Sequence, residues 1–490
     1  MVEKYDFKNP HLIHRLTLDQ VIKEIENQEI EYVTIYYTAV AQIFCKRVYR
    51  YHFLNSVKDE GVKMPLILLN ITVANDIVTT KNYDIGNATC DSIVRVDLES
   101  GFRRMSWLGK HHVCCFGIPE TIKGSILKVN SRNFLKATLE KAKQELDLTF
   151  MHAPELEYYL VNEKTNEIVN KFPNINLKDY SGTVRNSDYC LATVIDRQEA
   201  LNEKIKKNVN DCGIYLELLF NEHGPGQQEI NIRYEDSLTS SDNQILVKQC
   251  IKHTAYENGF GATFMPKPYA DQDGSSCHIH ISVYKDGKSI FAPSNDKSQN
   301  DKIDIGDGKF IDCNKNLLYF LGGLCKYIPE MFLIFANNVN SYKRYKLNSF
   351  APIYSNAWCY DSRSTGIRVV GEGNSLRLEV RFAGSDANAY LLPSCIIGAG
   401  CEGIKNKIDP PPQSTGNTYE FNENDEKKFQ LKNAPTTLLE SIKIFEKSDF
   451  CKQLLGEELY ETIISIAKFE WQEFNDHISA YEIKRNLDSC

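Results

Sequence analysis

The chain has 490 residues, of which 42% are hydrophobic and 25% charged, and its formal net charge is −8. These values are typical of a globular protein with a large core, and the acidic balance gives no reason to expect nucleic acid as a partner. We expect neither a secretory signal nor a membrane span, because the N-terminus lacks an apolar region and the longest apolar runs are short or contain charges. Fifteen cysteines, an odd number without a C-x-x-C pair, favour reduced thiols and a cytoplasmic protein.

The first part of the chain is predicted to form a small α+β domain that covers residues 1–120. Thr17 precedes apolar residues at helical spacing and predicts a helix over residues 17–30. Short runs of β-branched and aromatic residues predict strands at 32–37, 42–51, 66–72 and 92–97.

A larger domain is predicted over residues 121–490, and it begins with an amphipathic helix at 131–145 capped by Ser131. Further strands are predicted at 150–162, 214–220 and 277–284. Further helices are predicted at 197–212, 241–258, 314–338 with a kink or break at Pro329, 436–445, 450–455 and 460–487. The polar segment 294–309 is predicted to be a surface loop.

The strand predicted at residues 277–284 has a polar face. Side chains alternate along a strand, which puts His278, His280 and Ser282 together, opposite an aliphatic face. The pattern fits the floor of a polar site, but it fits equally well a half-buried strand whose polar face meets water. The H-x-H pattern alone does not decide between them.

Three other segments favour the site. The segments are a strand with Glu155 and Glu157 on one face, a Gly/Pro turn between Glu222 and Glu229, and a strand that places Glu379 between Arg377 and Arg381. Five carboxylates and an imidazole in one cavity would repel each other unless cations lay between them. Oxygen ligands of this kind suit Mg²⁺ or Mn²⁺ better than zinc.

Six motifs occur in order along the chain: Pro154-Glu-Leu-Glu, Glu222-His-Gly-Pro-Gly-Gln-Gln-Glu, Lys267-Pro followed by Gly274-Ser-Ser-Cys-His-Ile-His, Asn340-Ser-Tyr-Lys-Arg, the pair Arg363 and Arg368, and Arg377-Leu-Glu-Val-Arg-Phe. With these motifs the chain resembles the glutamine synthetase family over nearly its whole length. The resemblance implies an α+β protein with a small N-terminal β-grasp-like domain and a catalytic domain built on a curved antiparallel sheet flanked by helices. It also implies a ring-shaped homo-oligomer whose active sites lie between subunits.

The resemblance assigns two to three Mg²⁺ or Mn²⁺ ions to each site. The metal nearer glutamate and the acceptor would be held by Glu157, Glu222 and Glu229. The metal bridging the nucleotide phosphates would be held by Glu155, His278 and Glu379. ATP is implied as a co-substrate.

The resemblance also assigns the arginines. Glutamate would be bound by Arg344, Arg381 and Gly274. The catalytic arginines would be Arg344, Arg363 and Arg381. ATP would be bound by His280, Ser282, Arg363, Arg368 and Arg377.

Phe350 departs from the pattern of family members that use ammonia. Those members carry at this position a glutamate that helps to bind and deprotonate ammonium, and phenylalanine can do neither. Their Asp-Gly-Ser-Ser signature is missing from residues 30–115, and Asp273 stands where many members have an asparagine that contacts glutamate. The segments around Phe350 and the C-terminus look more like the γ-glutamylpolyamine and γ-glutamylputrescine synthetases, so Phe350 is predicted to line an acceptor-amine pocket.

Three functions therefore stay open at the level of sequence. The first is an ATP-dependent ligase that joins glutamate to a primary amine. The second is an ordinary glutamine synthetase that joins glutamate to ammonia. The third is a non-catalytic structural protein like the eye-lens relatives, although the complete set of six metal ligands weighs against it, because buried carboxylates without a use are costly.

Overall fold

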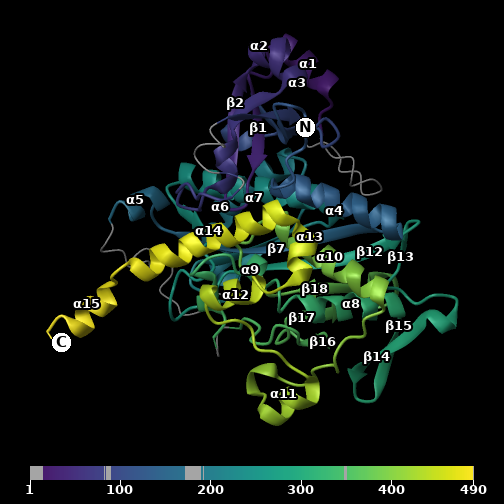
Figure 1. Ribbon diagram of the computed structural model, residues 1–490. Helices are drawn as coiled ribbons and strands as arrows, with labels where there is room; N and C mark the ends of the chain where they lie inside the picture. The colour runs from purple at the N-terminus through teal and green to yellow at the C-terminus, as the bar shows by residue number, and fades with distance from the viewer. Residues whose placement is uncertain are drawn as a thin grey trace.

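The computed structural model describes residues 15–81, 83, 90–171, 189, 190, 192–346 and 350–488. Two β-sheets organise these residues, a six-stranded sheet in the N-terminal part and a ten-stranded sheet in the rest (Figure 1). Helices cover the larger sheet, so the predicted α+β class is confirmed. The last strand of the first sheet ends at Thr121 and the next helix begins at Ser131. The domain boundary near residue 120 stays a prediction.

The N-terminal sheet has the strand order β2-β1-β6-β4-β3, with β5 paired to β6. Thr17 caps the first helix: its hydroxyl accepts a hydrogen bond from the Gln20 N–H, and its own N–H donates to the side-chain oxygen of Gln20. The elements are α1 (Leu18–Glu26), β1 (Tyr32–Thr38), β2 (Ile43–Tyr49), α2 (Arg50–His52), α3 (Lys58–Glu60), β3 (Val62–Pro65), β4 (Asp91–Val96), β5 (Arg103–Arg104) and β6 (His112–Thr121).

The larger sheet has the order β16-β17-β18-β12-β7-β9-β8, and β7 also pairs with β10 and β11. Its long strands β7 and β12 are antiparallel and alternate between polar and apolar side chains, as predicted. The strands are β7 (Thr149–Val161), β8 (Leu216–Asn221), β9 (Gln227–Ile232), β10 (Glu235–Asp236), β11 (Gly261–Thr263), β12 (Cys277–Lys285), β13 (Lys288–Ser289), β16 (Trp358–Tyr360), β17 (Ile367–Val370) and β18 (Arg377–Val380).

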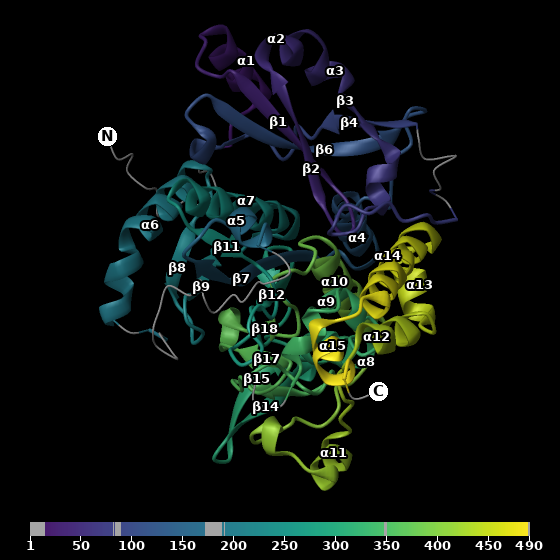
Figure 2. The same cartoon turned by 90° about the vertical axis from the view of Figure 1, so that its left-hand side faces the viewer.

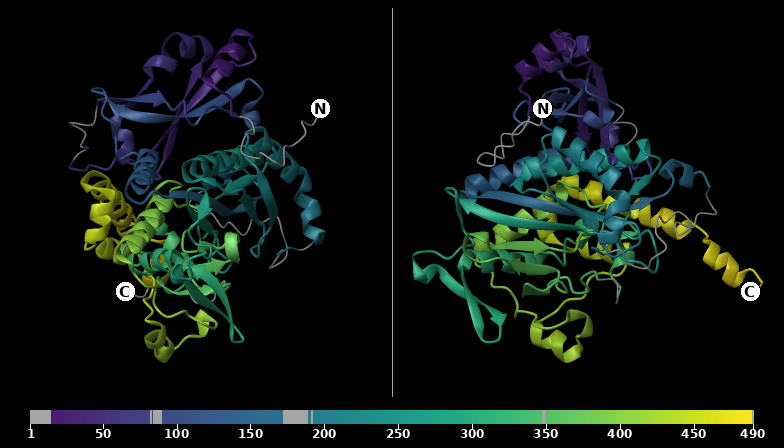
Figure 3. Two further views of the ribbon diagram at one scale, coloured as in Figure 1. Left: turned by 90° about the vertical axis from the view of Figure 1, so that its right-hand side faces the viewer. Right: turned by 180° about the vertical axis from the view of Figure 1, so that it is seen from behind.

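The helices that follow the N-terminal sheet in sequence lie beside the larger sheet, and the last of them lead to the C-terminus (Figure 2 and Figure 3). They are α4 (Ser131–Leu146), α5 (Thr165–Val169), α6 (Ala192–Asp211), α7 (Ser237–Glu257), α8 (Lys315–Tyr327), α9 (Phe332–Phe335), α10 (Leu391–Asn406), α11 (Glu423–Phe429), α12 (Leu438–Phe445), α13 (Asp449–Leu455), α14 (Glu457–Asp476) and α15 (Ala480–Asn486). Among the helices of the described ranges, none is both long and apolar enough to cross a bilayer.

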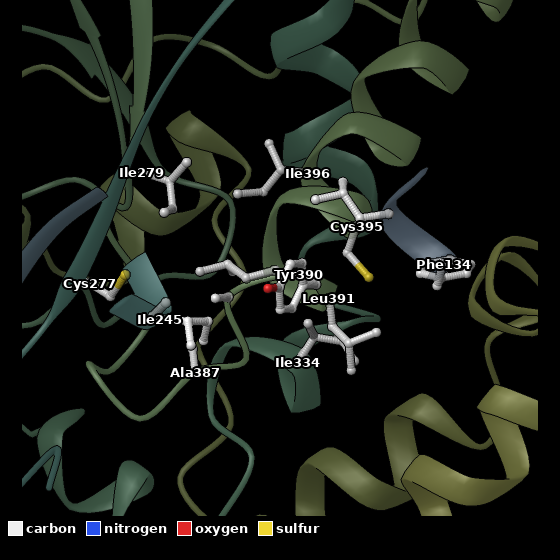
Figure 4. Packing of buried hydrophobic residues seen from close by; sticks show 14 of the residues in the cluster. Phe134, Ile245, Cys277, Ile279, Ile334, Ala387, Tyr390, Leu391, Cys395 and Ile396 are labelled. Carbon is white, nitrogen blue, oxygen red and sulfur yellow. The ribbon is translucent and has the colours of Figure 1, made fainter. Parts of the chain in front are cut away.

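The apolar face of β12 anchors the core. Cys277 and Ile279 point from the strand toward Leu391 and Ile396 of α10 (Figure 4), and all four side chains are buried. Because this face is held against helices, the opposite face of β12 must present its histidines to the other side of the sheet.

A buried ion pair joins the two parts of the chain. Arg132 of α4 contacts Asp97, which follows β4, at 2.8 Å and Asp242 of α7 at 2.8 Å. All three side chains are at most 4% exposed, and the Tyr390 hydroxyl donates a further hydrogen bond to Asp242 at 2.8 Å. This network fixes the N-terminal sheet relative to the larger sheet.

Several predicted elements were wrong in detail. Residues 66–72 are not a strand but contain a 3₁₀ helix over Leu66–Asn70, because a continuous apolar run does not distinguish a strand from a buried helical turn. The predicted loop 294–309 instead contributes to a hairpin of β14 (Asn300–Gly306) and β15 (Lys309–Asn314). The cap of α4 is Asn130 rather than Ser131, whose hydroxyl donates to the Ala39 carbonyl.

Two long predicted helices are each divided. The helix expected over 314–338 splits into α8 and α9, and Pro329 lies between them, as its missing N–H would require. The helix expected over 460–487 splits into α14 and α15 at His477, whose backbone is extended.

Candidate active site

Neighbouring strands bring the predicted polar residues together on one face of the larger sheet. His278 of β12 is directly opposite Glu155 of β7, and His280 is directly opposite Glu379 of β18. Glu157 of β7 is directly opposite Glu229 of β9. Four strands therefore supply one continuous polar surface.

Glu155 lies at the centre of the first half of this surface. Its carboxylate oxygens are 3.3 Å from the Nδ1 atom of His278 and 2.9 Å from the Nε2 atom of His280. Although burial opposes the shift, the two imidazoles hold the pKa of Glu155 well below its usual range. Glu155, His280 and Glu379 each place one ligand atom within 4.8 Å of the others, a spacing that suits one metal ion. His278 lies beside this group, with Nδ1 at 3.6 Å from Glu379.

Glu379 lies between two arginines. Arg368 of β17 contacts one of its oxygens at 2.9 Å, and Arg381 contacts the other. Burial opposes ionisation, but Arg381 and His278 lower the pKa of Glu379 to about 2. The carboxylate is therefore kept charged and fixed in orientation, as a metal ligand must be.

Glu157 belongs to the second half and accepts hydrogen bonds from the start of β9 and from the residue before β12. Its carboxylate accepts hydrogen bonds from the Ser276 N–H at 2.9 Å, from the Ser276 hydroxyl and from the Gln227 amide at 3.1 Å. The same amide of Gln227 donates to the Gly274 carbonyl at 3.1 Å. Sequence reasoning gave no role to Gln227 or Ser276, although both stand inside the motifs that it used.

Glu222 and Glu229 complete this half, and the charge of Glu222 acts on Glu229. Burial, with the charge of Glu157, raises the pKa of Glu222 to about 7 and that of Glu229 to about 10. Such shifts mean that the carboxylates crowd each other where water cannot screen them. This donor set fits divalent cations bound by oxygen, which would replace the protons.

Arg344 and Arg381 are both buried, and Arg381 contacts Glu379. Arg344 donates to the Phe382 carbonyl at 3.0 Å. Gly274 is in close contact with the Arg344 stem, because a Cβ atom at Gly274 would lie 2.6 Å from Arg344 Cγ. The Nε atom of Arg381 is buried and has no hydrogen-bond partner within the described part of the chain. Both positions suit the binding of an anion.

The residues predicted to bind ATP occupy the β12–β18–β17 side of the surface. Arg377 Nε donates to Nδ1 of His280 at 3.2 Å, so that this arginine orients the imidazole. Ser282 is half-buried one step farther along β12. Arg363 is exposed in the turn before β17, and its charge opposes the rise in the pKa of Glu222 that burial causes. Arg363 therefore lies on the exposed side of the site, close enough for its charge to act on Glu222.

Phe350 is 64% exposed at the mouth of the site. Its backbone φ is +54°, in the left-handed region, and its ring meets that of His223 edge to face at 5.9 Å between centroids. His223 Nδ1 in turn lies 2.6 Å from Oδ2 of Asp273. The sequence singled out Phe350 and Asp273 but not His223.

Comparison with known proteins identifies the family. Residues 128–486 match the family described as glutamine synthetase, catalytic domain. The glutamate–isopropylamine ligase of a Pseudomonas species is 30% identical over 447 residues, which cover 90% of this chain and 92% of that protein. A glutamine synthetase of Thermotoga maritima is 30% identical over 370 residues, which cover 75% and 78% of the two chains.

A third relative and a solved structure agree with this result. The γ-glutamylethanolamide synthetase GlnA4 of Streptomyces coelicolor is 32% identical over 293 residues, 60% of this chain and 58% of that protein. The ligand-free structure of GmaS has the same fold, with a TM-score of 0.80 and 21% identity over 96% of this chain and 100% of that chain. The polar sheet, its buried carboxylates and these matches together place the chain in the glutamine synthetase family, whose members are ATP-dependent ligases of glutamate.

Proposed function

We propose that this protein joins the side-chain carboxyl group of glutamate to a primary alkylamine at the expense of ATP. The observation that carries the proposal is the aromatic ring of Phe350, exposed at the mouth of the site where a glutamate would be needed to bind ammonium. An amine with an alkyl chain can pack on this ring, whereas ammonium has little apolar surface to bury. Relatives named for isopropylamine and ethanolamide support the choice.

The chemistry requires activation of a carboxylate, whose oxide is a poor leaving group. Transfer of the γ-phosphoryl group of ATP to the glutamate side chain would give γ-glutamyl phosphate and ADP. The amine nitrogen would then attack the carbonyl carbon, the bond to the phosphate oxygen would break, and γ-glutamylamide, phosphate and a proton would be released.

Both reacting groups are anions, so the site must neutralise them. Arg344 and Arg381, with the backbone of Gly274, would clamp glutamate, because a guanidinium group binds a carboxylate bidentately. Arg363 and Arg368 would meet the phosphates, with Arg381 close to the transferred group.

The nucleotide side would be completed from β12 and β18. His280 would face the phosphates, and its ring is oriented by the hydrogen bond from Arg377. Ser282 and Arg377 would contact the nucleotide.

Divalent metals fit the two halves of the carboxylate surface. One would be held by Glu157, Glu222 and Glu229, and another by Glu155 and Glu379 with His278 or His280, since both imidazoles reach Glu155. When bound, Mg²⁺ or Mn²⁺ would supply positive charge to the phosphates and to glutamate.

The test is an assay of phosphate release with ATP, Mg²⁺ and glutamate, in which ammonium, methylamine, isopropylamine, ethanolamine, putrescine and spermidine are compared as acceptors. The proposal expects kcat/KM for at least one amine to exceed that for ammonium, and mass spectrometry to detect the γ-glutamylamide. Efficient use of ammonium without a response to any amine would instead support ordinary glutamine synthesis. That second candidate is favoured by relatives such as the Thermotoga enzyme.

We also propose a cytoplasmic ring-shaped homo-oligomer in which the N-terminal domain of a neighbour closes each site. Activity should then depend on assembly. The test is sedimentation at decreasing protein concentration, combined with the phosphate assay. Fully active monomers would contradict the proposal.

A further inference from the structure

Three segments that are distant in the sequence meet at the mouth of the active site. They are the turn between β8 and β9, which carries His223, the loop before β12, which carries Asp273, and the segment that carries Phe350. His223 contacts both of the others, at 2.6 Å to the Asp273 carboxylate and at 5.9 Å between its ring and that of Phe350. The three side chains form one cluster, which we call the mouth cluster.

The backbone holds the mouth cluster firmly in place. The Tyr159 hydroxyl, at the end of the polar face of β7, donates to the Asp273 carbonyl at 2.7 Å. Gly224 lies over the same hydroxyl, where an added Cβ atom would come within 1.9 Å of it. Only glycine therefore allows the β8–β9 turn to approach the loop so closely, and the approach brings His223 within reach of Asp273.

Asp273 is next in the chain to a residue that is linked by a hydrogen-bond network to the carboxylate of Glu157. It precedes Gly274, whose carbonyl is tied through the Gln227 amide to Glu157. The Asp273 side chain is 17% exposed, whereas Glu157 is buried and Phe350 is exposed. Burial and the charge of Glu157 raise its pKa, and the facing His223 opposes this rise. His223 contacts both the Asp273 carboxylate and the Phe350 ring, so a cation whose alkyl part packs on Phe350 would lie close to this carboxylate.

We propose that Asp273 is the carboxylate that binds the ammonium group of the incoming acceptor, that His223 positions it, and that Phe350 packs on the alkyl part of the same molecule. The proposal rests on the proposed amine ligase activity and defines its substrate class as a primary alkylammonium ion. It divides recognition into a charge contact and an apolar contact that can be separated by experiment. The charge contact with Asp273 would replace the ammonium-binding carboxylate that ammonia-using members carry at the position of Phe350.

The experiment is a KM series with methylamine, ethylamine, propylamine and butylamine for the wild type, Asp273→Asn and Phe350→Ala. Loss of the charge contact in Asp273→Asn should raise KM for every amine by a similar factor, about tenfold or more. Loss of the ring in Phe350→Ala should raise KM by a factor that grows with chain length, by up to about fourfold for each buried methylene. KM for glutamate should stay within about twofold in both variants, since the clamp of Arg344 and Arg381 is intact.

His223→Asn provides the test of positioning. It should raise KM for amines less than Asp273→Asn does, and the double variant should add little to Asp273→Asn alone. Asp271→Asn, which removes an exposed carboxylate two residues away, is the matched control and should leave all KM values unchanged. Amine-independent formation of ADP from ATP and glutamate should be retained in every variant, which shows that the activating half-reaction is intact.

The outcomes separate this inference from the proposed function. If the wild type uses amines but Asp273→Asn leaves their KM unchanged, or raises KM for glutamate equally, the inference is wrong and the amine ligase stands. If the wild type uses only ammonium, the amine ligase is wrong. Then KM for ammonium in Asp273→Asn decides whether the carboxylate still binds the acceptor.

Discussion

Glu157 and Glu229 lie directly opposite each other on the antiparallel strands β7 and β9, and both are buried. Like charges in this arrangement repel, and a low local dielectric strengthens the repulsion. Burial, and then the charge of Glu157, raise the pKa of Glu229 to about 10, so that without a cation the protonated form is favoured. The strand register itself thus creates the demand for a metal.

This relationship predicts how stability without metal depends on pH. Glu222 and Glu229 have pKa values in the folded state of about 7 and about 10, above those of an unfolded chain. Their contribution to stability is therefore fully present below about pH 4 and is lost as pH rises through these values. Mg²⁺ should raise the melting temperature more at about pH 8.5 than at about pH 6, by roughly 2 °C or more, since fewer protons compete. Differential scanning fluorimetry with Mg²⁺ or EDTA would measure this.

Glu229→Gln is the informative variant for this prediction. It removes the repulsion, so the metal-free variant should be more stable than the metal-free wild type at about pH 8.5, while the stabilisation by Mg²⁺ should shrink. Equal effects of Mg²⁺ at both pH values in the wild type would show that the carboxylates do not share a cation.

Arg344, which is buried, and Arg363, which is exposed, should have different kinetic roles. Arg344 is buried against Gly274, so Arg344→Ala should mainly raise KM for glutamate, by roughly tenfold to a hundredfold, through loss of a carboxylate clamp. Arg363 is exposed and faces the carboxylates, so Arg363→Ala should mainly lower kcat through loss of charge stabilisation in phosphoryl transfer. Steady-state kinetics with glutamate and ATP varied separately would measure both, and the reverse pattern would mean that the roles are exchanged.

The buried ion pair between the two sheets should dominate the stability of their junction. Arg132→Leu would leave Asp97 and Asp242 buried without their cation, at a cost of about 3–5 kcal/mol. Arg104→Leu, which breaks a partly exposed pair with Glu24 at 2.7 Å, should cost less than about 1 kcal/mol and serves as the control. Urea unfolding followed by fluorescence would measure the free energy of unfolding of both variants. Similar losses in the two variants would show that the ion pairs of Arg132 do not stabilise the junction more than the exposed pair does.

The sequence predicted most reliably which side chains share a face of a strand, because strand periodicity alone determines this. Alternation along β12 and β7 placed the histidines and glutamates on one face. A shift by one residue would turn the apolar side chains of these strands away from the core, so burial of the apolar face fixes which face is polar. The resemblance then grouped the glutamates and His278 into two metal sites, whereas the order of the strands comes from the structure. Periodicity alone could not give this information, since β18 and β12 are separated by nearly a hundred residues.

What the sequence missed depends on contacts between loops. His223 reaches Asp273 only because Gly224 lets two loops approach around the Tyr159 hydroxyl, and no spacing in the sequence encodes that approach. The metal ligands show the same limit. His278 was expected with Glu155 and Glu379, yet His280 also lies in ligand range, since both imidazoles lean toward Glu155.

Phe350→Glu should move the preference of the enzyme from alkylamines toward ammonium. The substitution removes an apolar ring that would bury two to four methylenes, each worth about 0.8 kcal/mol, and adds a carboxylate beside His223 that a small cation can use. We expect kcat/KM for butylamine to fall by roughly tenfold or more and that for ammonium to rise, measured by phosphate release under identical conditions. Phe350→Gln is the control of similar size without charge, which should lose butylamine activity without a gain with ammonium. If Phe350→Glu left the ratio of the two kcat/KM values unchanged, the ring at position 350 would not select the acceptor.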